Sequence, residues 1–189
     1  MANTYHTITV AVDSSALSAW SEHRDMNKLM RDAKAVVQTA SRRDWLMSDI
    51  SADRSYLGLT SLDWLASESE APLCTTEYLD STSGYWWFVW VLYRTDLHAS
   101  IEGLGEILRL AQEQPGRFGA SAKMVTAVHD WDRGCGEADF DIPDPSGDGD
   151  DPTYVLSAIF TFRRLLNIAR SQELIVVHMR YSFRPSVEA

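Results

Sequence analysis

The sequence has little positive charge. It contains 17 Lys and Arg against 27 Asp and Glu, which gives a formal net charge of −10 over 189 residues. Binding to nucleic acids and to anionic membranes depends largely on Lys and Arg side chains that neutralise phosphates. The composition therefore argues against a protein that binds nucleic acid directly or adheres to a membrane, and we expect neither partner.

Cysteines and long apolar stretches are also scarce. The two cysteines, Cys74 and Cys135, form no CxxC pair, so neither a redox motif nor a zinc knuckle is indicated. The first residues lack the basic start and apolar stretch of a secretory signal. The most apolar run, Tyr85 to Tyr93, is far shorter than the roughly 20 residues of a membrane-spanning helix. We expect a soluble, cytoplasmic protein with reduced thiols.

The common signature motifs of enzymes are missing too. The chain has no Walker loop, no GxGxxG, no GxSxG and no HExxH. Nucleotide binding and the familiar hydrolase mechanisms therefore lack their main sequence signal. We assign no catalytic residue, metal site or cofactor, and we favour a binding protein over an enzyme.

The remaining composition is that of an ordinary folded protein. Hydrophobic residues make up 45% of the chain and charged residues 23%, and seven of the residues are Trp. The length suits one domain. We expect a single domain over residues 1–189, with an acidic loop insertion at 130–152.

Hydrophobic periodicity predicts that strands and helices alternate along the chain. Asp151-Pro152 is a typical helix start, with Asp as the cap and Pro in the first turn. Short helices are expected within residues 42–84. The alternation favours an α/β (or α+β) fold with a sheet of about four strands and three main helices packed on it. The expected strands are 5–12, 85–93, 120–131 and 174–181, and the expected helices are about 15–41, 97–111 and 153–171.

The strongest anomaly is the concentration of acid between residues 130 and 151. Nine Asp and Glu lie there with a single basic residue, Arg133. Like charges held close together repel one another, so such a cluster calls for a reason. Three interpretations are open: a solubilising insertion, a surface that docks on a basic partner, and a Ca²⁺ or Mg²⁺ site within residues 144–151. The last lacks the ligand spacing of an EF-hand.

The docking hypothesis rests on the spacing of the carboxylates. Asp139 and Asp141 are two residues apart, so an extended backbone places them on one side, about 6.6 Å from each other. A groove that binds nucleic acid contacts phosphates that are separated by similar distances. Trp131 is included because aromatic residues dominate interface energies. The candidate partner-binding residues are Asp139, Asp141, Asp144, Asp148, Asp150, Asp151 and Trp131.

Two alternatives to docking are open. A metal-dependent enzyme could use His129, Asp130 and Asp132 with carboxylates of the acidic loop. If residues 120–131 form a strand, however, His129 and Asp130 point to opposite faces. A structural subunit of a larger assembly would explain the apolar 153–171 helix and the many Trp residues.

The leading hypothesis is an acidic protein-binding module. It would act as an inhibitor or immunity-type protein that docks on the basic, nucleic-acid-binding surface of another protein. Phage and mobile-element anti-defence proteins are examples of such a class. Electrostatic steering and charge complementarity would supply its specificity.

Overall fold

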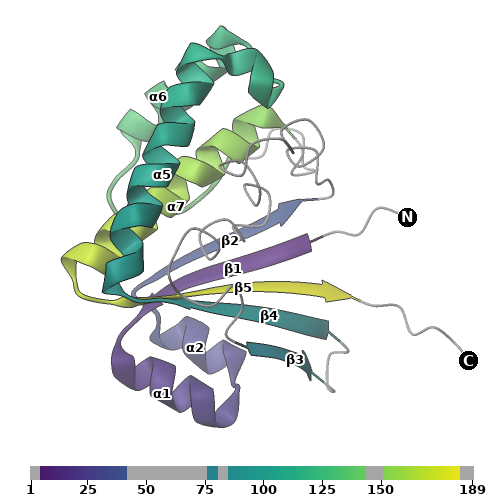
Figure 1. The fold of residues 1–189 in the computed structure, drawn as a ribbon, viewed down its shortest axis with the longest axis vertical. Helices are drawn as coiled ribbons and strands as arrows, with labels where there is room; N and C mark the ends of the chain where they lie inside the picture. Colours follow the sequence, from purple (N-terminus) through teal and green to yellow (C-terminus); the bar gives the residue numbers. More distant parts are fainter. Residues whose placement is uncertain (1–4, 42–75, 81–84, 144–150, 184–189) are drawn as a thin grey trace, which may run out of the picture.

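The structure is a computed structural model that describes residues 5–41, 76–80, 85–143 and 151–183. Within this part of the chain, an antiparallel sheet in the order β2-β1-β5-β4-β3 carries helices on both faces (Figure 1). The α/β class is therefore confirmed, and the sheet has one strand more than the sequence predicted. The strands are β1 (Tyr5–Val12), β2 (Ala35–Ser41), β3 (Thr76–Asp80), β4 (Tyr85–Leu92) and β5 (Ile175–Phe183).

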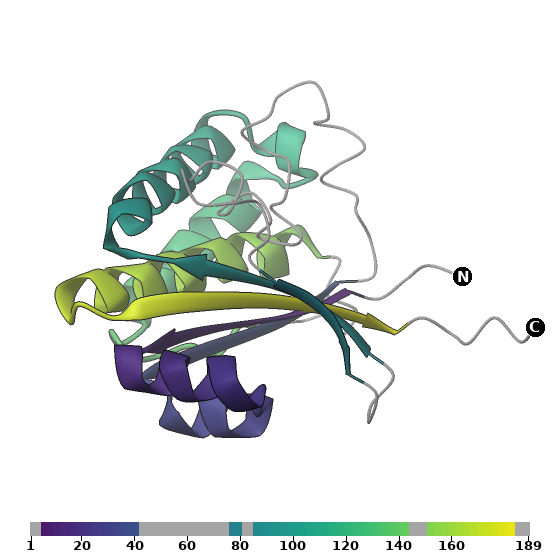
Figure 2. The ribbon, with the colours of Figure 1, turned by 60° about the horizontal axis from the view of Figure 1, so that its bottom comes forward.

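The helices form two layers, one on each side of the sheet. Figures 1 and 2 show α1 and α2 on one face and α5, α6 and α7 on the other. A short 3-10 helix, η2 (Pro115–Phe118), follows α5. The helices are α1 (Ser14–His23), α2 (Met26–Asp32), α5 (Arg94–Glu113), α6 (Ala122–Gly134) and α7 (Pro152–Ser171).

Both faces of the sheet are buried. Val10 and Val177 pack with Trp20 in the layer of α1 and α2, whereas Ala11 and Val176 belong to the larger core beneath α5, α6 and α7. Strands buried on both faces read as continuous apolar runs, as expected for 85–93. Helix α7 is buried over most of its length inside this chain. Its apolar character is thus accounted for without a further subunit.

The predicted helix over 15–41 is wrong in its second half. Helix α1 ends at Arg24, whose φ of 52° is left-handed, and the Asp25 side chain accepts a hydrogen bond from Lys28 N to begin α2. Residues 35–41 form β2, which pairs antiparallel with β1. Val36 faces the α1–α2 layer and Val37 the opposite core. A strand that is apolar on both faces does not alternate, so its spacing resembled a helix.

The predicted strand over 120–131 is also wrong, because these residues mostly belong to α6. The Ser121 side chain caps this helix by accepting a hydrogen bond from Met124 N at 3.3 Å. Val125 and Val128 are the buried positions, three residues apart as on one face of a helix. His129 and Asp130 are therefore consecutive on a helix and do not point to opposite sides of a strand.

The acidic loop predicted at 130–152 begins later than expected, because α6 continues to Gly134. Residues 130–134 end α6, and Cys135–Pro143 continue without regular structure. Asp151 is confirmed as the cap of α7, since its Oδ1 accepts a hydrogen bond from Thr153 N at 2.7 Å.

Residues 76–80 form β3, where a loop with short helices was expected. Residues 42–75, which hold Cys74 and most of the region where short helices were predicted, lie outside the described residues. No helix in the described part of the chain is both long and apolar enough to cross a membrane.

Candidate docking surface after helix α6

Arg164 of α7 connects the end of α6 to the segment that follows it. Its side chain is only 15% exposed and forms a salt bridge with Asp132, which is 25% exposed. Its Nε donates a hydrogen bond to the backbone oxygen of Asp139 at 3.2 Å. The guanidinium also lies over the ring of Trp131, with Cζ 5.2 Å from the ring centroid. One side chain thus holds three parts of the 131–139 region in place.

The acidic segment is packed on the helical layer by alternate residues. Phe140 and Ile142 are half-buried against the larger core, whereas Asp139 and Asp141 are exposed. Asp141 N donates a hydrogen bond to Asp139 Oδ1 at 3.3 Å, and Asp139 N donates one to the backbone oxygen of Gly136 at 3.1 Å. The described part of this segment is therefore anchored with its carboxylates facing solvent.

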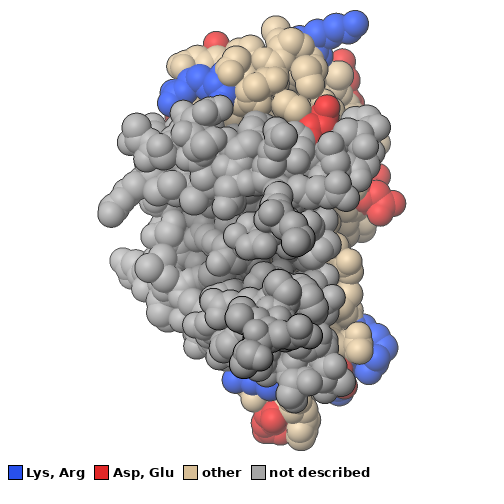
Figure 3. Space-filling view, turned by 90° about the vertical axis from the view of Figure 1, so that its right-hand side faces the viewer, with Lys and Arg blue, Asp and Glu red and all other residues tan. Residues whose placement is uncertain are grey.

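Charge on this surface is only partly neutralised. Asp132 is paired with Arg164, and Asp130 with Arg133. The exposed carboxylates of Glu137, Asp139 and Asp141 form no salt bridge with any described residue. In Figure 3, the described side chains at the rim of the face include both acidic and basic residues. Glu137, Asp139 and Asp141 therefore form a local cluster of unpaired negative charge after α6.

The structure brings only some of the predicted partner-binding residues together. Trp131 and Asp139 both contact Arg164, and Asp141 adjoins them. Trp131 is half-buried and packs against the core, so it supports the surface more than it extends from it. Asp151 is committed to capping α7. Asp144, Asp148 and Asp150 lie outside the described residues.

Arg164, the residue that organises this surface, was not among the predicted partner-binding residues, because the sequence left open whether the C-terminal arginines pair with the acidic loop or form a separate anion-binding face. The available signal was a pair of arginines in the middle of the apolar 153–171 helix. Charged residues are rarely buried unless they are paired. That rule asks for an acidic partner, but it does not say which of the many carboxylates of this chain supplies it.

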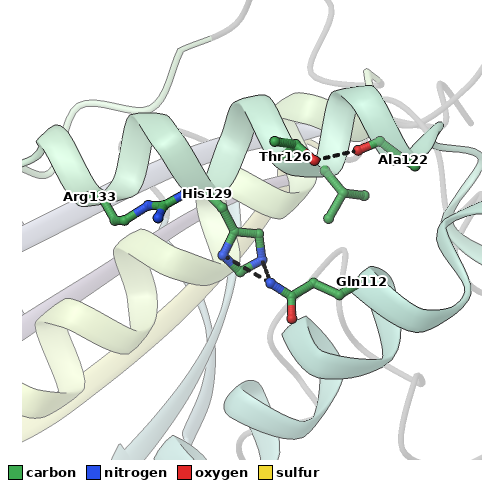
Figure 4. A pocket seen from close by; sticks show the side chains of 6 residues that line it. Gln112, Ala122, Thr126, His129 and Arg133 are labelled. Atoms are coloured by element: carbon green, nitrogen blue, oxygen red, sulfur yellow. Dashed lines mark hydrogen bonds between the residues drawn. The ribbon is translucent and has the colours of Figure 1, made fainter.

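A pocket of about 470 Å³ lies between α5 and α6 (Figure 4). Gln112 reaches from α5, and its Nε2 donates a hydrogen bond to Nε2 of His129 at 2.7 Å. Because an amide nitrogen only donates, the ring nitrogen accepts and the imidazole is neutral. Phe160 packs edge-on against the same ring, with the centroids 4.8 Å apart. The lining residues are Gln112, Ala122, Val125, Thr126, His129 and Arg133.

Electrostatics around His129 disfavour its charged form. Burial lowers the pKa of His129 below its ordinary value of 6.5, and the nearby carboxylate of Asp132 partly opposes that shift. Burial also raises the pKa of the Cys135 thiol above its ordinary value. A raised thiol pKa keeps the sulfur protonated and makes it a poor nucleophile at neutral pH.

The residues of the metal-enzyme alternative are engaged elsewhere. Asp130 pairs with Arg133, Asp132 pairs with Arg164, and His129 is hydrogen-bonded to Gln112. Among the residues that the structure describes, no group of three His, Cys, Asp or Glu side chains could hold a metal ion. Within the described ranges, His129, Asp130 and Asp132 are therefore not gathered into one metal site.

Comparisons with known proteins add nothing to what the fold and the surface indicate about function. No family model matches the chain, and no curated protein or solved structure matches it either.

Proposed function

We propose that this chain is an acidic protein-binding module that docks the carboxylates after α6 on a basic surface of another protein. One observation carries the proposal: Arg164 and the half-buried Phe140 and Ile142 hold Asp139 and Asp141 outward. A surface that is already ordered loses less conformational entropy on binding than a flexible loop does. Unpaired carboxylates on such a surface attract a basic partner and orient it.

The nucleic-acid-binding surface of a protein is the partner that fits best. A net charge of −10 steers the chain towards strongly basic surfaces, which are typical of proteins that neutralise phosphates. Asp139 and Asp141 would occupy places that phosphates otherwise take. The protein would then act as an inhibitor or immunity-type protein, for example a phage or mobile-element anti-defence protein.

The test is capture of partners from native lysate by the wild type and by the Asp139→Asn/Asp141→Asn variant. A matched control, Glu22→Gln/Glu102→Gln, removes the same charge at positions 72% and 68% exposed elsewhere on the molecule. Captured material is then challenged with double-stranded DNA and with high salt, which weakens charge-based contacts.

We expect the wild type and the control to capture a basic protein that DNA and salt displace. The Asp139→Asn/Asp141→Asn variant should capture at least tenfold less of it. If the variant retains the same partner as strongly as the control, docking through these carboxylates is wrong. If DNA leaves the complex intact, the partner does not engage this chain through a nucleic-acid-binding surface.

A further inference from the structure

Arg163 differs from the other arginines of the helical layer. It is half-buried on α7, and its Nε is buried without a hydrogen-bond partner. Within the described part of the chain it forms no salt bridge, although acids outnumber bases in the sequence. By contrast, four other described arginines form salt bridges with carboxylates: Arg94, Arg109, Arg133 and Arg164.

The guanidinium of Arg163 lies against the backbone of α5 at Gly105. Its Nη2, Cζ and Nε lie 3.4, 3.5 and 3.6 Å from the position that a Cβ on Gly105 would take. A residue with no side chain thus leaves room for the planar group beside the helix. The neighbouring acids of α5 are engaged elsewhere, because Glu102 pairs with His98 and Glu106 with Arg109.

A partly desolvated cation without a counter-ion is unfavourable. Its cost falls when an anion supplies the missing charge and accepts the free N–H groups. A guanidinium offers a planar fork that matches the two oxygens of a carboxylate or phosphate. The unpaired group therefore has the chemistry of an oxyanion receptor.

We propose that Arg163, at the α5–α7 interface, is a binding site for an oxyanion, a phosphate or carboxylate group carried by a ligand. The site is separate from the docking surface after α6. Consecutive residues on a helix point about 100° apart, so Arg163 faces α5 whereas Arg164 reaches the end of α6. Anion binding at Arg163 does not depend on the proposed docking function.

Thermal unfolding of the full chain tests the site, with sodium phosphate or sodium acetate as the probe. Ionic strength is kept constant with sodium chloride. The variants are Arg163→Gln, which removes the charge, and Arg163→Lys, which keeps the charge without the planar fork. Arg170→Gln is the matched control, because Arg170 is an exposed arginine of the same helix that donates a hydrogen bond to Asn167 and forms no salt bridge with a described residue.

We expect phosphate or acetate to raise the Tm of the wild type and of Arg170→Gln above the value in chloride alone. The apparent affinity should fall at least tenfold in Arg163→Gln and less in Arg163→Lys. In chloride alone, Arg163→Gln should be at least as stable as the wild type, because it removes an unpaired charge. The anion that acts at the lower concentration identifies the preferred group.

Two outcomes would overturn the site. One is a wild-type Tm that neither anion raises above chloride. The other is an equal response in the wild type and in Arg163→Lys and Arg163→Gln, which would place anion binding elsewhere. If Arg163→Gln fails to fold, the comparison of the wild type with Arg163→Lys decides the question.

Discussion

Thr9 Oγ1 lies 2.8 Å from Nδ1 of His178, and both side chains are completely buried in the middle of the sheet. The two residues are directly opposite each other on β1 and β5. Buried polar groups are stable only when they are hydrogen-bonded, so each of these side chains requires a partner. A shift of one residue between the strands would place the two side chains on opposite faces of the sheet and break the bond. The pair thus helps to fix the register of the two strands.

Replacing Thr9 with Val should lower the free energy of unfolding by about 1–3 kcal/mol. The shape of the side chain is kept, but Nδ1 of His178 loses its buried hydrogen-bond partner. Urea unfolding measures the effect. Thr9→Ser keeps the hydroxyl and should lose less stability than Thr9→Val, and the reverse order would contradict the role of the hydrogen bond.

Replacing Arg164 with Met should release the acidic segment and destabilise the fold by about 2 kcal/mol. The change leaves the half-buried Asp132 without its cation and removes the hydrogen bond to the Asp139 backbone. Chymotrypsin should cleave faster after Phe140, which becomes accessible when the segment detaches. Arg170→Met is the control on the same helix. An unchanged cleavage rate at Phe140 would show that Arg164 does not order the segment.

Replacing Ser157 with Ala should stabilise the protein by about 1 kcal/mol. The Ser157 hydroxyl is buried in α7 without a hydrogen-bond partner, and Ala is the better helix former. Thr161→Val one turn later is the opposite case, since Thr161 Oγ1 donates to the backbone oxygen of Ser157. We expect the two variants to move the urea midpoint in opposite directions. A loss of stability in Ser157→Ala would mean that its hydroxyl has a partner.

His129 should make the fold less stable in mild acid. Burial holds the pKa of His129 below 6.5 in the folded protein, so as pH falls through 6.5 the unfolded chain takes up the proton first. The free energy of unfolding therefore falls below about pH 6.5 and gains nothing from this group above it. Denaturant unfolding at pH 7.5 and 5.5 measures the loss. His129→Gln should lose less stability between these values than the wild type, and equal losses would exclude His129 as the source.

The correctly predicted elements have signals within their own residues. The cap at Asp151 and the apolar run of β4 are local features that tertiary structure did not change. β2 was mistaken for helix because its apolar residues face two different cores, and periodicity cannot separate that pattern from a helix. α6 was mistaken for strand because its Val and Thr residues outweighed the Ser121 cap.

The docking surface was predicted only in its local part. The carboxylates of Asp139 and Asp141 cluster in sequence and could be recognised there. Arg164 lies 32 residues from Asp132 and 25 from Asp139, so its role depends on how α6 and α7 pack. Pairing of the C-terminal arginines with the acidic loop was one open interpretation of the sequence, but with 120–131 predicted as a strand the pattern could not specify Arg164 and Asp132.

β5 lies between β1 and β4, although it is the last strand of the described chain. The β1–β2 and β3–β4 pairs can form early, but they cannot join before β5 inserts between them. Thr9 and His178 are 169 positions apart, and contacts of such long range slow folding. On the ribosome, the inner edges of β1 and β4 stay open until β5 has been synthesised. Open strand edges promote aggregation, so we expect nascent chains of this protein to depend on chaperones until residues 175–183 emerge.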